Sequence, residues 1–321
     1  MVLVTGGTGF LGSILIQHLV QTGHRVIATK RVDSIIPSRL NAASAVHWVD
    51  ADITDYFALA DIFGEVTQVY HCAAVVSYQK SDWAKMLHTN IQGTKHIVDL
   101  CLEHHARLVH VSSIASLGPR KNDELISENN FWDDGAPHSK YSLSKYESEM
   151  EVWRGIAEGL DAVIVNPSVI MGTGNKEKGA GALFALINKG LKIYPTGSIG
   201  IVDVTDVAAV MIQLMNDTSI HAERFILNSD NLSNKSLLEK IASLLEKPAP
   251  SIPAKKWLLS VAWRAAKLQS FFNKKKPALT RETAKASSTL LAYSNKKITD
   301  ALSYQFKPVV ETLKEMSLDY K

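Results

Sequence analysis

The stretch that decides the fold is Met1-Val-Leu-Val-Thr-Gly-Gly-Thr-Gly-Phe-Leu-Gly12. Its apolar residues 2–4 predict a buried strand, and apolar residues at helical spacing over 10–20 predict a helix. Between and within them lie four glycines, at positions 6, 7, 9 and 12. Such glycines let the chain turn tightly off a strand and let a pyrophosphate approach the backbone at a helix N-terminus, where unpaired N–H groups favour negative charge. The stretch therefore predicts a nucleotide-binding strand–turn–helix unit rather than an ordinary glycine-rich loop.

Composition narrows the class of protein further. The 321 residues are 46% hydrophobic, enough to bury a large core in one large or two modest domains. A net charge of +3, from 35 basic and 32 acidic residues, is too balanced to indicate a nucleic-acid partner. Cys72 and Cys101 show no metal or redox spacing, so we expect a reducing, cytoplasmic compartment. We expect no signal peptide ahead of the first strand and no membrane span, because no apolar run approaches ~20 residues.

The second predicted strand, 25–29, bears on the choice of cofactor. An acidic side chain at its end would hold the ribose hydroxyls of NAD, whereas a basic one accommodates the additional phosphate of NADP. Here the strand runs into Lys30 and Arg31. The two cations favour NADP(H) and leave NAD(H) open; the alternative interpretation is a solvated pair of surface charges.

Further apolar runs predict strands at 46–50, 69–75, 107–112, 161–166 and 225–228, and a long helical pattern spans 82–105. The run 107–112 leads into Ser112 and Ser113. Open α/β sheets bind ligands at the carboxyl ends of their strands, so these serines are candidate site residues. The histidines, His71 among them, show no metal-ligand spacing, and we predict no metal site.

Tyr141 and Lys145 form a candidate acid–base pair. Residues four apart share one face of a helix. A tyrosine is a poor acid–base catalyst at its ordinary pKa of about 10, and a nearby ammonium would lower that pKa by stabilising the phenolate. The same spacing recurs at Tyr293 and Lys297, in a polar stretch without a preceding serine strand. We interpret that second copy as a chance match.

Together, the TGGTGFLG fingerprint, the serine strand, the Tyr141–Lys145 pair and the phrase Asn166-Pro-Ser-Val-Ile-Met-Gly172 resemble the extended short-chain dehydrogenase/reductase (NAD-dependent epimerase/dehydratase) superfamily. The NPSxxxG phrase is most similar to dihydroflavonol-reductase-like and hydroxysteroid-dehydrogenase-like members, since sugar-nucleotide epimerases commonly carry an arginine before that proline. The resemblance implies an α/β fold, a doubly wound parallel (Rossmann) sheet of strand order near 3-2-1-4-5-6-7. It also implies a smaller, mostly helical C-terminal substrate domain. We expect the bounds 1–168 plus 205–229 for the first domain and 169–204 plus 230–321 for the second.

The resemblance also implies residue roles. Tyr141 would donate the proton, Lys145 would hold the nicotinamide ribose, and Ser113 (or its neighbour Ser112) would orient the carbonyl. Asn90 would lie beside the nicotinamide and help to relay the proton. The expected cofactor-binding residues are Gly6, Thr8, Gly9, Phe10, Leu11, Gly12, Lys30, Arg31, Asp52, Ile53, Ala73, Ala74, Val75, Ser112, Tyr141, Lys145, Asn166, Pro167 and Ser168. Away from the site, we expect Thr54 or Asp55 to cap the helix that follows them, and Asp206 to cap a helix over 207–215.

The expected activity is NADP(H)-dependent reduction of a carbonyl, or oxidation of the alcohol, on a small lipophilic substrate. The expected apolar pocket comprises Val76, Tyr78, Ala115, Leu117, Met171, Leu183 and Phe184. Alternatives are a sugar-nucleotide epimerase or dehydratase with tightly bound NAD, a redox-sensing binding protein, and an interfacial enzyme acting on lipids. The last depends on residues 255–276, an amphipathic basic stretch that either packs over the pocket or lies on a membrane surface. We expect a monomer or a homodimer.

Overall fold

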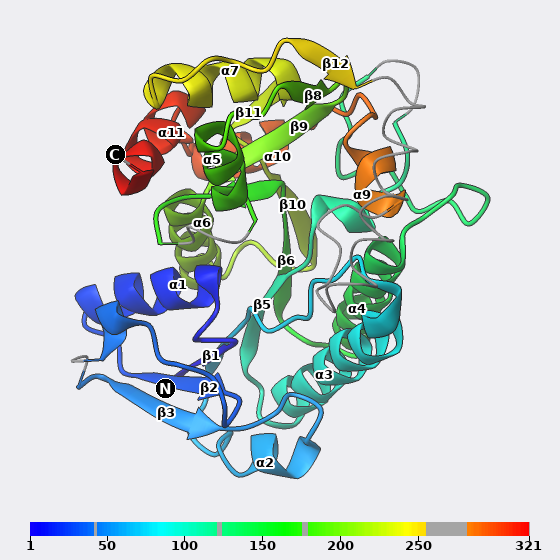
Figure 1. Cartoon of the computed structure of the whole chain (residues 1–321). Helices are drawn as coiled ribbons and strands as arrows, with labels where there is room; N and C mark the ends of the chain where they lie inside the picture. The colour runs from blue at the N-terminus through cyan, green and yellow to red at the C-terminus, as the bar shows by residue number, and fades with distance from the viewer. Residues whose placement is uncertain (42–43, 121–123, 175–178, 255–280, 321) are drawn as a thin grey trace.

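A computed structural model describes residues 1–41, 44–120, 124–174, 179–254 and 281–320. Figure 1 shows a central sheet with helices on both faces and, above it in this view, a second group of helices and short strands. The amphipathic stretch 255–276, for which we predicted either pocket packing or membrane contact, lies outside the described residues.

The central sheet has seven strands in the order β10-β6-β5-β4-β1-β2-β3, and every pairing is parallel. This confirms the predicted doubly wound fold and its strand order, with β10 as the seventh strand. The order reverses between β1 and β4, and such a switch point is where open α/β sheets bind nucleotides. The strands are β1 (Val2–Thr5), β2 (Val26–Lys30), β3 (Val46–Asp50), β4 (Gln68–His71), β5 (Arg107–Val111), β6 (Ala162–Pro167) and β10 (Glu223–Leu227).

Two pairs of helices cover the sheet (Figure 1). The helices α1 (Phe10–Gln21) and α6 (Val204–Asn216) pack on one face, in a hydrophobic cluster that includes Leu15 and Met211. The helices α3 (Trp83–Glu103) and α4 (Lys140–Ala157) pack on the other face. Burial on both faces explains why the strands read as continuous apolar runs in the sequence.

Helix caps test two of the sequence predictions. The short helix α2 (Tyr56–Ala60) begins at Asp55, whose Oδ1 accepts a hydrogen bond from the Ala58 N–H at 3.1 Å, as one of the two predicted caps. The predicted cap at Asp206 is wrong. Helix α6 begins three residues earlier, and the Asp203 Oδ1 accepts from the Thr205 N–H at 2.7 Å.

Asp206 serves a different purpose within α6. Its carboxylate accepts hydrogen bonds from the Tyr304 hydroxyl at 2.8 Å and from the Lys307 N–H at 2.9 Å. It therefore joins the C-terminal part of the chain to the helix beside the sheet.

The second group of elements contains two small sheets as well as helices. A three-stranded sheet is formed by β7 (Val169–Met171), β9 (Ser198–Asp203) and β11 (Asp230–Ser233), and a two-stranded sheet by β8 (Ile193–Pro195) and β12 (Ile252–Ala254). The helices are α5 (Gly181–Asn188), α7 (Asn234–Leu244), α9 (Arg281–Ala286), α10 (Lys296–Leu302) and α11 (Val309–Ser317). These elements come mainly from the stretches that we assigned to the smaller domain; the domain bounds themselves stay a prediction.

Two of the expected pocket residues lie elsewhere. Met171 and Phe184 have no exposed surface and belong to the hydrophobic cluster beneath α7 and α11, so assigning them to an open pocket was wrong. Apolar side chains at these positions complete a core, which the sequence alone does not distinguish from a pocket wall.

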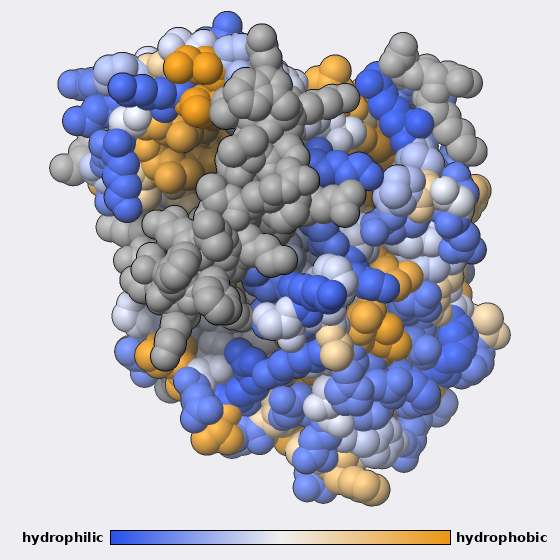
Figure 2. Space-filling model, turned by 45° about the vertical axis from the view of Figure 1, so that its right-hand side comes forward, coloured by the Kyte–Doolittle hydropathy of each residue, from blue (hydrophilic) through white to orange (hydrophobic). Residues whose placement is uncertain are grey.

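The surface in the view of Figure 2 is mainly hydrophilic, with hydrophobic residues gathered in separate patches. Within the part of the chain that the structure describes, no helix is long and apolar enough to cross a bilayer.

Candidate active site

The glycine turn after β1 places the backbone close to a neighbouring strand end. Gly6 has a φ of +68°, and a Cβ on it would lie 2.8 Å from the backbone N of Ala73. A Cβ on Gly12 would lie 2.4 Å from the carbonyl oxygen of Gly6. Only glycine allows both approaches, because real Cβ atoms do not come so close to backbone atoms. The turn therefore has the close packing that a dinucleotide-binding loop needs.

A cavity of about 360 Å³ follows the carboxyl ends of β1 to β4. It brings together ten predicted cofactor residues: Gly6, Thr8, Gly9, Lys30, Arg31, Asp52, Ile53, Ala73, Ala74 and Val75. The glycine backbone and the two cations suit the phosphates of a nucleotide, so the residues present fit a nicotinamide dinucleotide.

The cavity also has lining residues that we did not predict as cofactor contacts: Thr29, Ser34, Ala51, Cys72, Lys85 and Thr89, together with Val76, which we expected in the substrate pocket. Most are chain neighbours of predicted residues. Lys85 and Thr89 lie one helical turn apart on α3, just before Asn90, and this helical spacing is the signal that could have revealed them.

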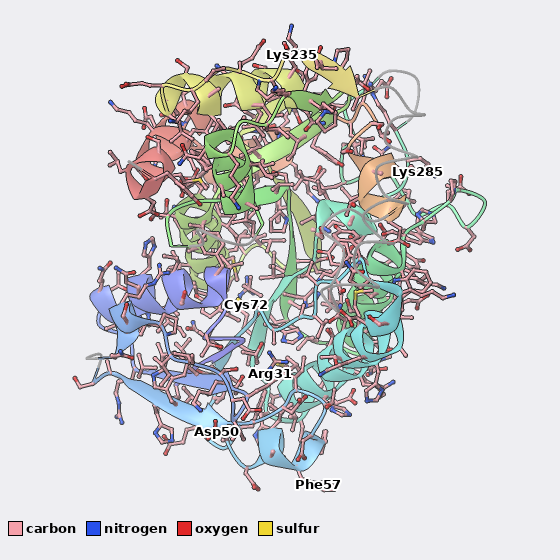
Figure 3. All side chains as sticks on the ribbon, viewed as in Figure 1. Arg31, Asp50, Phe57, Cys72, Lys235 and Lys285 are labelled. Atoms are coloured by element: carbon pink, nitrogen blue, oxygen red, sulfur yellow. The ribbon has the colours of Figure 1, made fainter. Side chains whose placement is uncertain are left out.

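The cations at the end of β2 differ in their surroundings. The Lys30 ammonium forms an ion pair with Asp50, its register partner on β3. Arg31 is exposed, and in the view of Figure 3 it lies between Asp50 below and Cys72 above. Burial acts to raise the pKa of Asp52, but hydrogen bonds from Thr54 and the charges of Arg31 and Lys85 outweigh it and leave the pKa lowered.

The wall formed by the segment after β4 is held by Asn90. This residue is buried on α3; its Oδ1 accepts from the Val75 N–H at 2.7 Å, and its Nδ2 donates to the Val75 carbonyl at 3.0 Å. Nδ2 also donates to the Ser144 Oγ on α4 at 3.1 Å. Both amide hydrogens are therefore bound to protein groups, which favours a positioning role for Asn90 over proton relay.

Helix α4 carries the predicted acid–base pair. Ser139 caps its start by accepting from the Ser142 N–H at 2.9 Å, which places Tyr141 in the first turn and Lys145 one turn further. Lys145 is buried and donates from Nζ to the Val111 carbonyl at 2.7 Å, at the end of β5. Burial lowers the pKa of Lys145 to about 8, despite the opposing charge of Glu149.

The Tyr141 phenol shows the reverse of the predicted shift. Burial raises its pKa, and a hydrogen bond with the Ser113 side chain partly opposes the rise. The expectation that Lys145 lowers this pKa is therefore wrong for this structure, because desolvation dominates and the ammonium is bonded to the Val111 carbonyl. The ring of Tyr78 lies 5.4 Å from that of Tyr141, which adds an aromatic wall beside the phenol.

The two candidate serines point to different neighbours. The Ser113 Oγ accepts a hydrogen bond from the Ala115 N–H at 3.1 Å, and a hydrogen bond with the Ser113 side chain acts to lower the pKa of the Tyr141 phenol. The Ser112 hydroxyl instead donates to the Glu149 carboxylate at 2.6 Å, as does the Nδ2 of Asn166 at 2.9 Å. Ser113 is therefore the serine that interacts with Tyr141, whereas Ser112 and Asn166 belong to a buried polar cluster around the Glu149 carboxylate.

The remaining predicted cofactor residues also lie outside the cavity lining. In helix α1, Leu11 belongs to the core, the partly buried Phe10 packs against that core, and Gly12 lies against the glycine turn. Pro167 ends β6, and Ser168 is buried, its N–H donating to the Leu227 carbonyl at 2.9 Å. The structure places Tyr141, Lys145 and Ser113 on elements beside the cavity rather than in its lining.

The second tyrosine–lysine copy lies apart from this site. Tyr293 precedes α10 and bridges to Ile126, whereas Lys297 lies on α10 and pairs with Glu223. The two residues do not share a helix, which agrees with a chance match.

Comparison with known proteins identifies the family. Residues 2–227 match the model of the NAD dependent epimerase/dehydratase family. The chain belongs to this family. The family and the relatives that match the chain are NAD(P)-dependent enzymes of the extended short-chain dehydrogenase/reductase type. This protein is an enzyme of the same type.

Relatives within the epimerase/dehydratase family include reductases. The "Putative dihydroflavonol 4-reductase" of Synechocystis sp. is 27% identical over 318 residues, 97% of this chain and 91% of the relative. The "Tetraketide alpha-pyrone reductase 2" of Arabidopsis thaliana is 29% identical over 273 residues, 78% of this chain and 83% of the relative. The crystal structure of gox2253 matches the structure of this protein with a TM-score of 0.84 and 27% sequence identity. The match covers 98% of this chain and 96% of the gox2253 chain.

Proposed function

We propose that this protein is an NADP(H)-dependent oxidoreductase that reduces a carbonyl, or oxidises the corresponding alcohol, on a small lipophilic substrate. The observation that carries the proposal is the arrangement of Ser113 beside the Tyr141 phenol, with Lys145 one turn along α4. Two contacts support their association with the nucleotide cavity: Lys145 interacts electrostatically with the lining residue Cys72, and the Tyr141 ring lies 5.4 Å from that of Tyr78. Two relatives are named as reductases, which favours this chemistry over others in the family.

The bound cofactor would supply the hydride, while the protein positions the substrate and manages the proton. Tyr141 donates its proton to the carbonyl oxygen, and the Ser113 hydroxyl orients that oxygen by hydrogen bonding. Because burial raises the pKa of Tyr141, the phenol holds its proton at neutral pH, as a general acid must. Lys145, with a pKa of about 8, is mainly charged there and would hold the ribose of the nicotinamide nucleotide.

Arg31 supports the preference for NADP(H). It is exposed at the cavity, whereas Lys30 is paired with Asp50. A guanidinium binds phosphate through two parallel hydrogen bonds, which suits the additional phosphate of NADP.

The lipophilic substrate is supported by the side chains near Tyr141. The Tyr78 ring faces the catalytic phenol, and Val76, at the cavity, is 63% exposed. The relatives' names refer to a dihydroflavonol and a tetraketide α-pyrone, both of which are ring compounds.

The experiment is NADPH oxidation by the purified protein with a panel of aromatic and aliphatic ketones and aldehydes. Tyr141→Phe should lower kcat by roughly 10²–10⁴-fold with NADPH binding retained. Tyr146→Phe, on the same helix, is the matched control and should keep its activity. Turnover that survives in Tyr141→Phe would refute the assignment.

Sugar-nucleotide epimerisation or dehydration is the second candidate, because the matching family is named for these reactions. Such an enzyme retains NAD through its cycle. Denaturing the purified protein and identifying any released nucleotide separates the two candidates: released NAD favours the epimerase, and reversible NADPH binding favours the reductase.

A further inference from the structure

The carboxylate of Glu149 lies at the centre of a buried polar cluster behind Ser113. Glu149 has no exposed surface. Its Oε2 lies 2.6 Å from the hydroxyls of Ser112 and Ser116 and accepts from the Asn166 Nδ2 at 2.9 Å. Its Oε1 pairs with Arg224 at 3.1 Å. We call these five residues the Glu149 cluster.

The cluster encloses the backbone at Ser113. Ser112 and Ser116 lie on either side of it in the chain, and both bind the same carboxylate oxygen. Asn166 also donates to the Ser113 carbonyl at 3.1 Å. Glu149 therefore holds the loop that carries Ser113 directly through Ser112 and Ser116, and indirectly through Asn166.

The same carboxylate belongs to the catalytic helix. Tyr141, Lys145 and Glu149 follow one another at intervals of four on α4 and share one face of it. A loop fixed to Glu149 is thus fixed relative to the Tyr141 phenol. This relation determines whether the Ser113 and Tyr141 hydroxyls can reach one carbonyl oxygen together.

A buried charge is a costly way to hold a loop, because desolvating a carboxylate is unfavourable even when it is paired. Arg224 offsets that cost and is itself held by the Glu128 carbonyl at 3.1 Å. The charge also acts on Lys145, since burial lowers the pKa of Lys145 and Glu149 opposes that shift.

We propose that Glu149 is a positioning residue of this site, which holds the Ser113 loop against α4 and keeps a negative charge one turn from Lys145. The proposal rests on the proposed reductase function for its catalytic readout. A neutral side chain of the same shape could also form hydrogen bonds that hold the loop. The experiment therefore tests the effect of the negative charge of Glu149.

The other titratable groups that interact with Lys145 lie on β4, on β5 and directly after β4. His71 and His110 are buried side by side on β4 and β5, and burial, with a smaller effect from Lys145, lowers the pKa of both. Burial raises the pKa of the Cys72 thiol to about 12. These three groups are neutral near pH 7. Glu149→Gln and Glu149→Asp therefore differ in whether the carboxylate charge near Lys145 is removed or kept.

Glu149→Gln removes the charge and keeps the shape. We expect kcat to fall about 10-fold. We also expect the alkaline limb of the plot of NADPH-dependent activity against pH to move to lower pH by about one unit, because Lys145 then loses its proton more easily. Glu151→Gln is the matched control: Glu151 lies on the same helix, partly exposed and paired with Arg154. A Glu149→Gln profile that overlays the wild-type profile overturns the proposal.

Glu149→Asp keeps the charge but shortens the reach, and it tests the positioning even where the glutamine variant does not fold. We expect kcat to fall while the alkaline limb of the plot of activity against pH stays where it is in the wild type. A kcat equal to that of the wild type would overturn the positioning role. The pH dependence of NADPH affinity is measured for every variant without a substrate. If the wild-type protein binds NADPH but reduces no carbonyl, the proposed function is refuted. If the alkaline pH at which NADPH affinity falls is nevertheless lower in Glu149→Gln than in the wild type, the link between Glu149 and Lys145 is still supported.

Discussion

The Asn90 side chain binds both backbone polar groups of Val75, accepting from its N–H at 2.7 Å and donating to its carbonyl at 3.0 Å. This pair of bonds fixes the segment after β4 to α3, and that segment forms one wall of the nucleotide cavity. A carboxamide is suited to the task because it presents a donor and an acceptor together.

Replacing Asn90 should therefore loosen the cavity wall. Asn90→Ala leaves the Val75 N–H and carbonyl without their partners, and we expect about 2 kcal/mol of lost stability and roughly 10-fold weaker NADPH binding. Urea unfolding and fluorescence titration measure the two effects. The control is His88→Ala, an exposed position on the same helix. Unchanged cofactor affinity in Asn90→Ala would show that the wall holds its shape without this residue.

The two neighbouring serines should separate catalysis from support. Ser113→Ala removes the hydroxyl near the Tyr141 phenol, and kcat should fall roughly 100-fold. Ser112→Ala removes one donor to Glu149, and kcat should fall less than about 10-fold with about 1 kcal/mol of lost stability. Steady-state kinetics of the two variants decides the assignment. The opposite order of effects would make Ser112 the substrate-orienting residue.

The two cations at the end of β2 should also differ. Arg31→Ala should weaken NADPH binding by roughly 10–100-fold and leave NADH binding nearly unchanged, since a charge-assisted bond to phosphate is lost. Lys30→Ala should have the smaller effect, because Lys30 is paired with Asp50. Titrations with both cofactors test this. Equal losses for NADPH and NADH would mean that Arg31 does not contact the additional phosphate.

Lys145 should make the stability depend on pH. Its pKa is lowered from 10.5 to about 8, so between these values the unfolded chain binds more protons and the free energy of unfolding rises with pH. Below pH 8 the folded protein carries the full cost of burying the ammonium. Lys145→Met should therefore stabilise the protein by up to roughly 3 kcal/mol at pH 7 and by less at pH 10, while turnover is lost. Urea unfolding at both pH values tests the sign; a gain that grows with pH would contradict it.

Arg107 should be needed for stability rather than for catalysis. Its buried guanidinium donates from Nη2 to the carbonyl oxygens of Leu214, Asp217 and Ile220 at 2.9, 2.9 and 2.6 Å, at the end of α6. Arg107→Met leaves these carbonyls without this donor and should cost about 3 kcal/mol. Arg154→Met, at a partly exposed ion-pair site, should cost less than about 1 kcal/mol. Urea unfolding measures both effects, and a similar loss of unfolding free energy in the two variants would contradict this prediction.

The fold was largely predictable because parallel strands buried on both faces leave continuous apolar runs, such as residues 162–165 of β6. Fingerprint and catalytic motifs are local patterns, and the structure indeed brings Gly6, Arg31 and Ala73 to one cavity. Long-range partners were not predictable in this way. Glu149 is four residues from Lys145, but its partner Arg224 is 75 residues away, and nothing in the sequence joins them.

Two wrong predictions have a common physical cause. Asp203 and Asp206 both precede apolar helical residues, and only the backbone conformation decides which of them caps α6. The pKa of Tyr141 depends on how deeply the phenol is buried, which the spacing to Lys145 does not reveal. Both properties arise from tertiary packing rather than from local sequence.

The start of α6 has a consequence for the order in which the chain becomes structured. Its two carboxylates, on Asp203 and Asp206, bind Thr312 and Tyr304, which follow 109 and 98 residues later. During synthesis the ribosome has made all seven strands of the sheet before either partner exists. Two acidic side chains that finish buried therefore have no distant partner until residues 304–312 have been made and have folded back onto this end of α6.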